Sequence, residues 1–231
     1  MIEKLTELYK SEAVPPTTLL LDLDGVIRLW PRNYSALEQE HNLPLGSVVT
    51  AAFESALLEQ VITGRITDRE WRTRVSHNLA IAYPSSSAEA AVAVWSNLVG
   101  SVNDEVLQLV TQVRENCMVG LVTNATDRLF LDLDVLGLAD YFAFIVNSSE
   151  VGFAKPSPDI FKHSLALAGV QPSEALFVDD SASNVSAANA IGIRAHHFVS
   201  VAALRTFLHS VGLVTGENCR WCSCWREGCC R

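Results

Sequence analysis

The sequence has little positive charge and no long apolar run. Its 231 residues contain 17 lysine and arginine residues against 26 aspartate and glutamate residues, a net charge of −9 at pH 7. This balance argues against a nucleic-acid-binding protein, because nucleic-acid-binding surfaces are usually basic. No segment approaches 18 uninterrupted apolar residues, and residues 1–7 lack the apolar stretch of a signal peptide. We therefore expect no nucleic-acid or membrane partner and a cytoplasmic location.

Cysteine is almost absent from the body of the chain. Cys117 stands alone there, and the last 13 residues contain the other five cysteines: Cys219, Cys222, Cys224, Cys229 and Cys230. Because a disulfide framework would spread through the fold, the body is expected to be reduced, with Cys117 a small buried apolar residue. Residues 214–231 are expected to form a Cys-rich tail that is disordered or an artefact of expression. Zinc binding by its thiols is the alternative.

The rest of the chain, with 49% apolar residues overall, alternates short apolar runs with helical patterns. Strands are predicted at about 17–22, 117–123, 144–147, 175–179 and 194–198. Helices are predicted at about 104–115, 126–136, 158–169, 183–191 and 200–210. Ser157 and Pro158 are placed to start a helix, and Gly137, Gly169 and Gly192 to end helices. This alternation predicts the α/β class, with a doubly wound parallel sheet covered by helices on both faces.

Residues 31–103 break this rhythm. Helices are predicted at Ser47–Glu59, Asp68–Ala80 and Ala88–Leu98, with no convincing strand among them. We therefore expect a core domain from residues 1–30 and 104–213, and an inserted helical domain at 31–103. Arg28 and Trp30 follow the first strand closely enough to line a substrate entrance. Trp71, Arg72 and Trp95 belong to the insert, and the two tryptophans are expected to pack between its helices.

Polar residues close several of the predicted strands. In parallel sheets, ligands bind beyond the carboxyl ends of the strands. Asp22 and Asp24 lie two residues apart in an extended segment and project to the same side, where they would repel one another unless a cation neutralised them. Asp179 and Asp180 arrive from another strand. A hard ion held by a few carboxylates and water is typically Mg²⁺.

A hydroxyl, an amide and an amine complete this set of polar residues. Thr123, Asn124 and Lys155 suit a phosphoryl group, whose charge is spread over several oxygens. An aspartate can attack phosphorus to give an aspartyl-phosphate. A second carboxyl group can protonate the leaving oxygen and then accept a proton from the hydrolytic water.

Four segments, in this order and spacing, resemble the motifs of the haloacid dehalogenase-like hydrolase superfamily. They are residues 22–27 (DLDGVI), 121–124 (LVTN), 155–161 (KPSPDIF) and 177–185 (FVDDSASNV). The resemblance covers about residues 15–210 and implies a Rossmann-like core with a small helical cap between the first two motifs. The last two motifs look most similar to the branch that contains the soluble epoxide hydrolase phosphatase domain and bacterial sugar-phosphate phosphatases.

The resemblance also implies a role for each site residue. Asp22 would be the nucleophile, and Asp24 the general acid and base, whose backbone carbonyl also binds Mg²⁺. Thr123, Asn124 and Lys155 would bind phosphate, with Thr123 and Lys155 also assisting catalysis. Asp180 would bind the metal directly and Asp179 through water. Dehalogenases of this superfamily lack an acid at the second position of the first motif, so Asp24 favours phosphate chemistry.

The expected substrate is a small phosphorylated metabolite, with a sugar phosphate favoured, and the expected state is a monomer or a homodimer. A phosphomutase of the same fold and a scaffold protein with a zinc-binding tail are the alternatives.

Two further patterns are given structural interpretations. Asp132 and Asp134 repeat the letters of the first motif but fall in a helical pattern, where they are expected to be solvated charges. His196 and His197 are expected to be core or surface residues rather than metal ligands.

Overall fold

A five-stranded parallel sheet forms the centre of the computed structural model, which describes residues 16–31 and 34–214. The strand order is β5-β4-β1-β6-β7. These strands are β1 Thr18–Leu21, β4 Met118–Thr123, β5 Phe144–Asn147, β6 Ala175–Asp179 and β7 Arg194–His197. All five predicted strands are present, and the predicted α/β class is confirmed.

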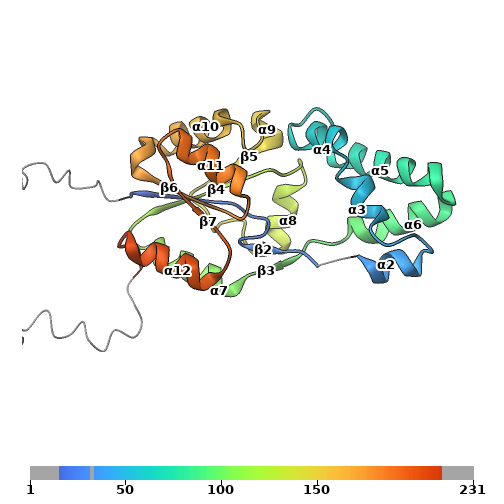
Figure 1. The fold of residues 1–231 in the computed structure, drawn as a ribbon, viewed down its shortest axis with the longest axis horizontal. Coiled ribbons are helices and arrows are strands. Elements are labelled where there is room, and N and C mark those ends of the chain that lie inside the picture. The colour runs from blue at the N-terminus through green and yellow to red at the C-terminus, as the bar shows by residue number, and fades with distance from the viewer. Residues whose placement is uncertain (1–15, 32–33, 215–231) are drawn as a thin grey trace, which may run out of the picture.

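Helices cover both faces of this sheet (Figure 1). One face packs against α7 Asp104–Val113, α8 Leu129–Val135 and α12 Val201–Ser210, and the other against α10 Pro158–Ala168 and α11 Ala182–Ala190. The central strand β1 serves both layers because successive side chains of a strand point to opposite faces. Leu19 and Leu21 lie in the first core cluster and Leu20 in the second. A strand buried on both faces is therefore mainly apolar, as β1 is from Leu19 to Leu21.

The predicted helix boundaries in the core are confirmed at several points. Ser157 caps α10 by accepting a hydrogen bond from the backbone N–H of Asp159 at 3.3 Å, and Pro158 is the first helical residue. Gly169 closes α10 with a φ of +70°. Two short elements were not predicted, namely α9 Ser148–Val151 and the 3₁₀ helix η1 Pro172–Glu174.

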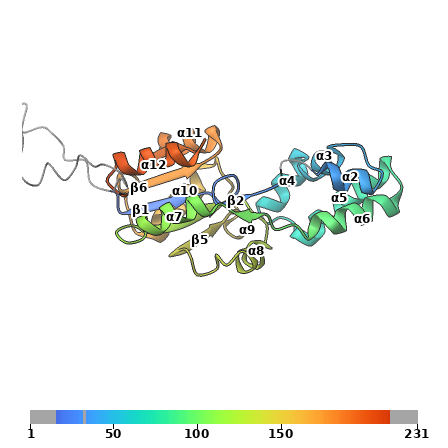
Figure 2. The ribbon, with the colours of Figure 1, turned by 90° about the horizontal axis from the view of Figure 1, so that it is seen from below.

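The helical insert, defined here as residues 34–98, lies at one end of the sheet (Figures 1 and 2). Its helices are α2 Ser35–Glu40, α3 Ser47–Ala52, α4 Ser55–Ile62, α5 Asp68–Ala82 and α6 Ser85–Ser96. They enclose a hydrophobic cluster of their own, separate from the two clusters of the sheet. Trp71 and Trp95 meet edge to face inside it, with ring centroids 5.1 Å apart. Their predicted packing role is therefore confirmed.

The predicted single helix Ser47–Glu59 is wrong, because the chain breaks at Phe53 and Glu54 into α3 and α4. Glu54 has a ψ of 128° and its carboxylate accepts hydrogen bonds from the N–H groups of Ala56 and Leu57, at 3.1 and 2.9 Å. A carboxylate that caps a new helix start competes with continuation of the old helix. Helix α2 was also missed.

The expectation of no strand within residues 31–103 is wrong as well. β2 Arg28–Leu29 and β3 Ser101–Val102 form a short antiparallel ladder at the point where the chain leaves the core for the insert and returns. Two-residue strands are too short to produce a period-2 hydrophobic pattern, so the sequence carries no signal for them.

The described helices are all short. The longest, α5, has 15 residues, whereas a helix that crosses a bilayer needs about 20 apolar residues. Within residues 16–31 and 34–214, no helix has the length and apolar character to span a membrane.

Candidate active site

Parallel strands bring the predicted site residues to one edge of the sheet. Asp22 follows β1 directly, Thr123 ends β4 and Asp179 ends β6. The backbone N–H of Asp22 donates to the carbonyl of Val178 at 2.9 Å, which continues the ladder between β1 and β6 to this edge. A pocket of about 450 Å³ opens here, lined by Asp22, Asp24, Gly25, Leu29, Trp30, Thr123, Asn124, Lys155, Asp180 and Asn184. We call it the catalytic pocket.

Lys155 bridges two of these aspartates. Its Nζ lies 2.7 Å from Asp22 Oδ1 and 2.7 Å from Asp179 Oδ2, and the lysine is 5% exposed. A buried ammonium of this kind requires anionic partners, because an unpaired charge is costly away from water. Burial by itself would lower the pKa of Lys155, but the attraction of Asp22 and Asp179 outweighs burial and raises it. The amine is therefore held as a fixed positive charge.

The carboxyl groups beside Lys155 have raised pKa values. Burial raises the pKa of Asp22 to about 7; Lys155 opposes this rise, and the negative charge of Asp179 reinforces it. Burial also raises the pKa of Asp180, again with repulsion from Asp179. Carboxylates close to one another repel, which raises their pKa values. A cation bound among them would lower these pKa values again.

Oxygens of Asp22, Asp179 and Asp180 lie within 4.8 Å of one another. This cluster can hold a hard cation, because three carboxylates against one lysine leave two negative charges uncompensated. Asp179 is already engaged: besides Lys155, it accepts from Asn184 Nδ2 at 3.0 Å on both oxygens and from the N–H of Ser181 at 2.8 Å. Asp22 and Asp180 therefore have the more available oxygens.

Gly25 lies against Asp180 at this cluster. Its φ is +80°, and a Cβ atom built there would come within 2.0 Å of Asp180 Oδ2. Only glycine combines that backbone conformation with so close an approach. The glycine in the first motif thus leaves the space that the Asp180 carboxylate occupies.

The predicted phosphate-binding residues differ in how they are used. The Thr123 hydroxyl is buried and has no hydrogen-bond partner among the described residues, although it belongs to the lining of the catalytic pocket. A buried polar group without a partner points to a missing ligand or water. The Asn124 amide, by contrast, donates to the Lys155 carbonyl and accepts from the Lys155 N–H, both at 2.8 Å. Its side chain positions the lysine loop, which the sequence did not reveal.

The carboxylate of Asp24 stands apart from the acidic cluster. The Arg28 guanidinium donates to both of its oxygens, with Nε 2.6 Å from Oδ1 and Nη2 2.9 Å from Oδ2. The indole N–H of Trp30 also donates to Oδ1, at 2.7 Å. Arg28 and Trp30 were expected near the substrate entrance, and the structure places both beside Asp24. Nothing in the sequence indicated that they would hold its carboxylate.

The expectation that Asp132 is a solvated charge is wrong. It is buried, and it accepts from Arg28 Nη1 at 3.0 Å and from Arg128 Nε at 2.9 Å. Asp134, two residues on, is exposed as expected. The helical period explains the difference, since two residues turn about 200° around the axis and place one aspartate inward and the other outward.

Asn184 was also missed as a site residue, although it lies in the fourth motif. The signal that could have found it is its spacing of five residues from Asp179, which places the first turn of α11 over the end of β6.

The histidines lie outside the acidic cluster. His196 stacks on Phe207 with ring centroids 4.6 Å apart, and burial lowers its pKa. His197 Nε2 lies 2.9 Å from the backbone carbonyl of Asp180.

In residues 16–31 and 34–214, the acidic cluster is the one group of side chains that could hold a metal ion. Cys117 is buried, as predicted, whereas residues 215–231 of the Cys-rich tail lie outside the described residues.

A family model for haloacid dehalogenase-like hydrolases matches residues 16–192. The chain belongs to this family. Among its relatives, bifunctional epoxide hydrolase 2 of Mus musculus is 27% identical over 199 residues, which cover 74% of this chain and 34% of the relative. Phosphoglycolate phosphatase 1 of Pseudomonas aeruginosa is 35% identical over 82 residues, which cover 35% of this chain and 30% of the relative. The matched part of the chain spans about a third of each of these relatives.

Solved structures of this family share the fold. A HAD family enzyme of Bacteroides thetaiotaomicron, in complex with magnesium and inorganic phosphate, is 26% identical with a TM-score of 0.64. The match covers 78% of this chain and 93% of that enzyme. A 2-haloacid dehalogenase of Pseudomonas syringae, 21% identical with a TM-score of 0.58, covers 84% of this chain and 99% of its own, and shows the same fold. The predicted family membership is confirmed.

Proposed function

We propose that this hydrolase is a Mg²⁺-dependent phosphatase that hydrolyses small phosphorylated metabolites through an aspartyl-phosphate on Asp22. The observation that carries the proposal is the bridge that Lys155 makes between Asp22 and Asp179, beside the partnerless hydroxyl of Thr123. A fixed cation and a free hydroxyl donor around a carboxylate suit an anionic substrate. Phosphoglycolate phosphatase 1 among the relatives, and a related structure with magnesium and phosphate bound, support the same chemistry.

The acidic cluster fits Mg²⁺ on the chemistry of its donors. Asp22 and Asp180 would bind the ion, with the Asp24 carbonyl as a further ligand and Asp179 acting through water. Bound there, the ion would neutralise the carboxylates and the phosphate oxygens, which lets two anionic groups approach each other.

The chain's own residues supply the two proton-linked steps. Among the described residues, the N–H of Leu23 and Nζ of Lys155 bind the Asp22 carboxylate, and both bind Oδ1, which leaves Oδ2 to attack phosphorus. As that bond forms, the ester bond from phosphorus to the substrate oxygen breaks, and Asp24 gives the oxygen a proton. Asp24 then accepts a proton from water, whose oxygen attacks phosphorus and releases Asp22 and phosphate. Thr123 and Lys155 bind the phosphate oxygens throughout.

We also propose that residues 31–103 act as a cap over the catalytic pocket. Thr126 of the core donates to the Asp68 carboxylate of the insert at 3.0 Å, and the Asp68 N–H donates to Asp127 at 2.7 Å. A cap in this position excludes water while the aspartyl-phosphate forms, and it must open to release the product.

Phosphate release from a panel of phosphate monoesters, with Mg²⁺ or with EDTA, tests the proposal. We expect turnover that requires Mg²⁺ and that falls at least about 10³-fold in Asp22→Asn, because the nucleophile is lost. Asp134→Asn, an exposed acid of α8, is the matched control and should turn over normally. Magnesium-loaded, folded protein that releases no phosphate from any ester would overturn the proposal.

Two other activities are outcomes of the same experiment. A dehalogenase would release chloride from 2-chloropropionate in a reaction that does not require a divalent cation. A phosphomutase would convert a sugar phosphate to its isomer with little free phosphate, so product analysis separates it from a phosphatase.

A further inference from the structure

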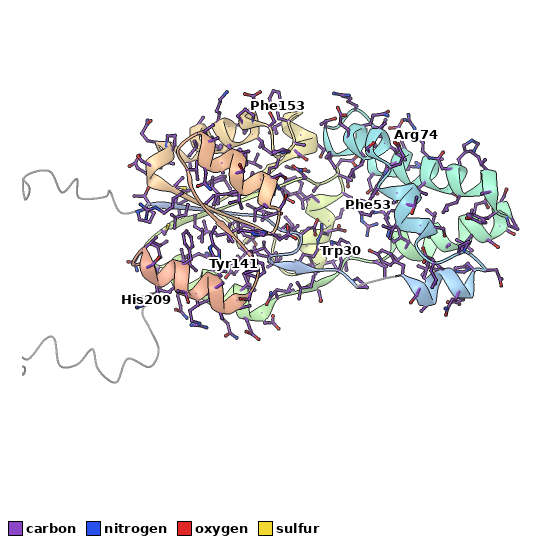
Figure 3. All side chains as sticks on the ribbon, viewed as in Figure 1. Trp30, Phe53, Arg74, Tyr141, Phe153 and His209 are labelled. Carbon is purple, nitrogen blue, oxygen red and sulfur yellow. The ribbon has the colours of Figure 1, made fainter. Side chains whose placement is uncertain are left out.

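A second cavity, of about 290 Å³, lies between the helical insert and the core. We call it the interdomain cavity. It adjoins the catalytic pocket, because Asp24, Trp30 and Asn124 line both. Figure 3 shows Trp30 from the core side and Phe53 from the insert in the region between the two. The volume lies at the small end of the range for ligand pockets, so it suits a compact group.

The walls of the interdomain cavity are mainly aromatic and aliphatic. The aromatic lining residues are Trp30, Tyr34, Phe53, Trp71 and Trp95. Phe53 meets Trp71 edge to face at 6.4 Å, which continues the contact of Trp71 with Trp95. Leu58 and Ile62 of α4 extend this surface. Rings held in this way present an apolar surface at little further entropic cost.

The charged side chains of the cavity are already paired. Arg72 binds the Asp68 carboxylate at 2.5 and 3.1 Å and lies over the Trp95 ring, 4.9 Å from its centroid. Arg28 is held by Asp24 and Asp132. No cationic side chain of the described cavity lining is therefore left to bind an anionic group on a substrate, and its carboxylates repel one. A sugar hydroxyl placed here would lose water and gain few partners.

Asp24 stands where the two cavities meet. With phosphate in the catalytic pocket and the rest of the substrate in the interdomain cavity, the ester oxygen between them would lie at this junction. That is the atom which needs a proton as it leaves. The catalytic pocket, Asp24 and the interdomain cavity thus follow one another in the same order as the phosphate, the ester oxygen and the leaving group of a phosphate monoester.

We propose that the leaving group of the substrate is a compact, uncharged aromatic or aliphatic alcohol, and not a sugar or a hydroxy acid. This assignment rests on the proposed phosphatase function, and it replaces the sugar phosphate favoured by the sequence. A mainly apolar pocket whose charged side chains already bind one another discriminates against substrates that carry several hydroxyl groups or a carboxylate.

Three phosphate esters of primary alcohols test the assignment with matched leaving-group chemistry. They are benzyl phosphate, glucose 6-phosphate and 2-phosphoglycolate. We expect kcat/KM for benzyl phosphate to exceed that of the other two by at least about tenfold, the scale of discrimination by an apolar pocket. Equal or higher kcat/KM for glucose 6-phosphate or 2-phosphoglycolate would overturn it.

Variants of the cavity lining test whether the preference arises there. Phe53→Ser removes an aromatic wall at a position that is 51% exposed, so the protein should fold. Leu58→Trp fills the cavity from α4. Both should lower kcat/KM for benzyl phosphate by about tenfold, and so reduce its advantage over glucose 6-phosphate and 2-phosphoglycolate. Ile81→Ser, at a 76% exposed site of α5 away from the cavity, is the matched control. Unchanged selectivity in both lining variants would contradict the assignment.

A binding measurement separates failure of this assignment from failure of the phosphatase proposal. Benzyl alcohol contains no phosphate, so its binding can be followed by saturation-transfer NMR whether or not the protein is active. We expect binding in the millimolar range, as for a fragment of this size, lost in Leu58→Trp and kept in Ile81→Ser. Absent binding, or binding that Leu58→Trp leaves intact, would overturn the assignment. Binding without turnover of any ester would overturn the phosphatase proposal alone.

Discussion

Arg28 holds Asp24 and Asp132 at the same time. Its Nε and Nη2 bind the two oxygens of Asp24, and its Nη1 binds Asp132 Oδ2 at 3.0 Å. Arg128 binds the other oxygen of Asp132 and also donates to the backbone carbonyl of Ser96, at the end of α6 in the insert. The proposed acid is thus connected to the insert through three ion pairs and one hydrogen bond to a backbone carbonyl.

We predict that Asp132→Asn destabilises the protein by about 1–3 kcal/mol, because the buried guanidinium of Arg28 and the half-buried one of Arg128 lose a charged acceptor. Asp134→Asn is the matched control. It makes the same chemical change two residues away on the exposed side of α8 and should alter the free energy of unfolding by less than about 0.5 kcal/mol. Urea denaturation of the two variants and the wild type measures the difference. Equal free energies of unfolding for the two variants would show that the ion pairs of Asp132 contribute little.

Gly25→Ala should lower metal-dependent activity on the order of 100-fold. Its Cβ would displace Asp180 Oδ2, which lies 2.0 Å from the position of that atom. Displacement of a proposed metal ligand by about 1 Å is enough to lower kcat on the order of 100-fold. Gly137→Ala separates this effect from backbone strain. Gly137 also has a positive φ, +70°, but nothing lies within 4 Å of the corresponding Cβ, so the substitution should cost only about 1–2 kcal/mol of stability.

The measurement is phosphatase activity as a function of Mg²⁺ concentration, with thermal unfolding in the presence and absence of Mg²⁺. Wild type and Gly137→Ala should both be stabilised by Mg²⁺, because an ion that binds only the folded state stabilises it. Gly25→Ala should lack this stabilisation and should keep only about a hundredth of the activity. Normal Mg²⁺ dependence in Gly25→Ala would mean that Asp180 does not bind the ion.

Asn124→Ala should reduce kcat through misplacement of Lys155. The substitution removes both hydrogen bonds between the Asn124 amide and the Lys155 backbone, and Lys155 Nζ then loses its fixed position between the two aspartates. We expect kcat to fall by about 10–100-fold. Asn124→Asp tests the cause, since it keeps an acceptor for the Lys155 N–H but loses the donor to the Lys155 carbonyl, and should be impaired as well. Steady-state kinetics that show a change in KM alone would instead indicate that Asn124 contacts the substrate.

The sequence predicts the parts of this protein whose signals are local. The buried strands β1, β4 and β6 are short and mainly apolar, and a polar residue ends or directly follows each of them, so Asp22, Thr123 and Asp179 could be placed together. Contacts of long side chains across the fold leave no such signal. Arg28 reaches Asp132 over 104 positions of sequence, and the sequence gives no sign of this pairing. The use of the Asn124 amide by the Lys155 backbone depends likewise on the path of a loop.

Cys117 should be slow to alkylate in the folded protein. Burial raises the pKa of its thiol to about 11, although a backbone hydrogen bond involving Leu19 opposes the rise. Because the thiolate is the reactive form, only about one molecule in a thousand is ionised here at pH 8. The rate of modification by iodoacetamide should therefore rise about tenfold per pH unit from pH 7 to 9 without levelling. Peptide mapping of the Cys117 peptide by mass spectrometry measures this rate apart from the other cysteines. In guanidinium chloride the same peptide should react faster and level off near pH 9, as an ordinary thiol does. Levelling at that pH in the native protein would contradict the burial argument.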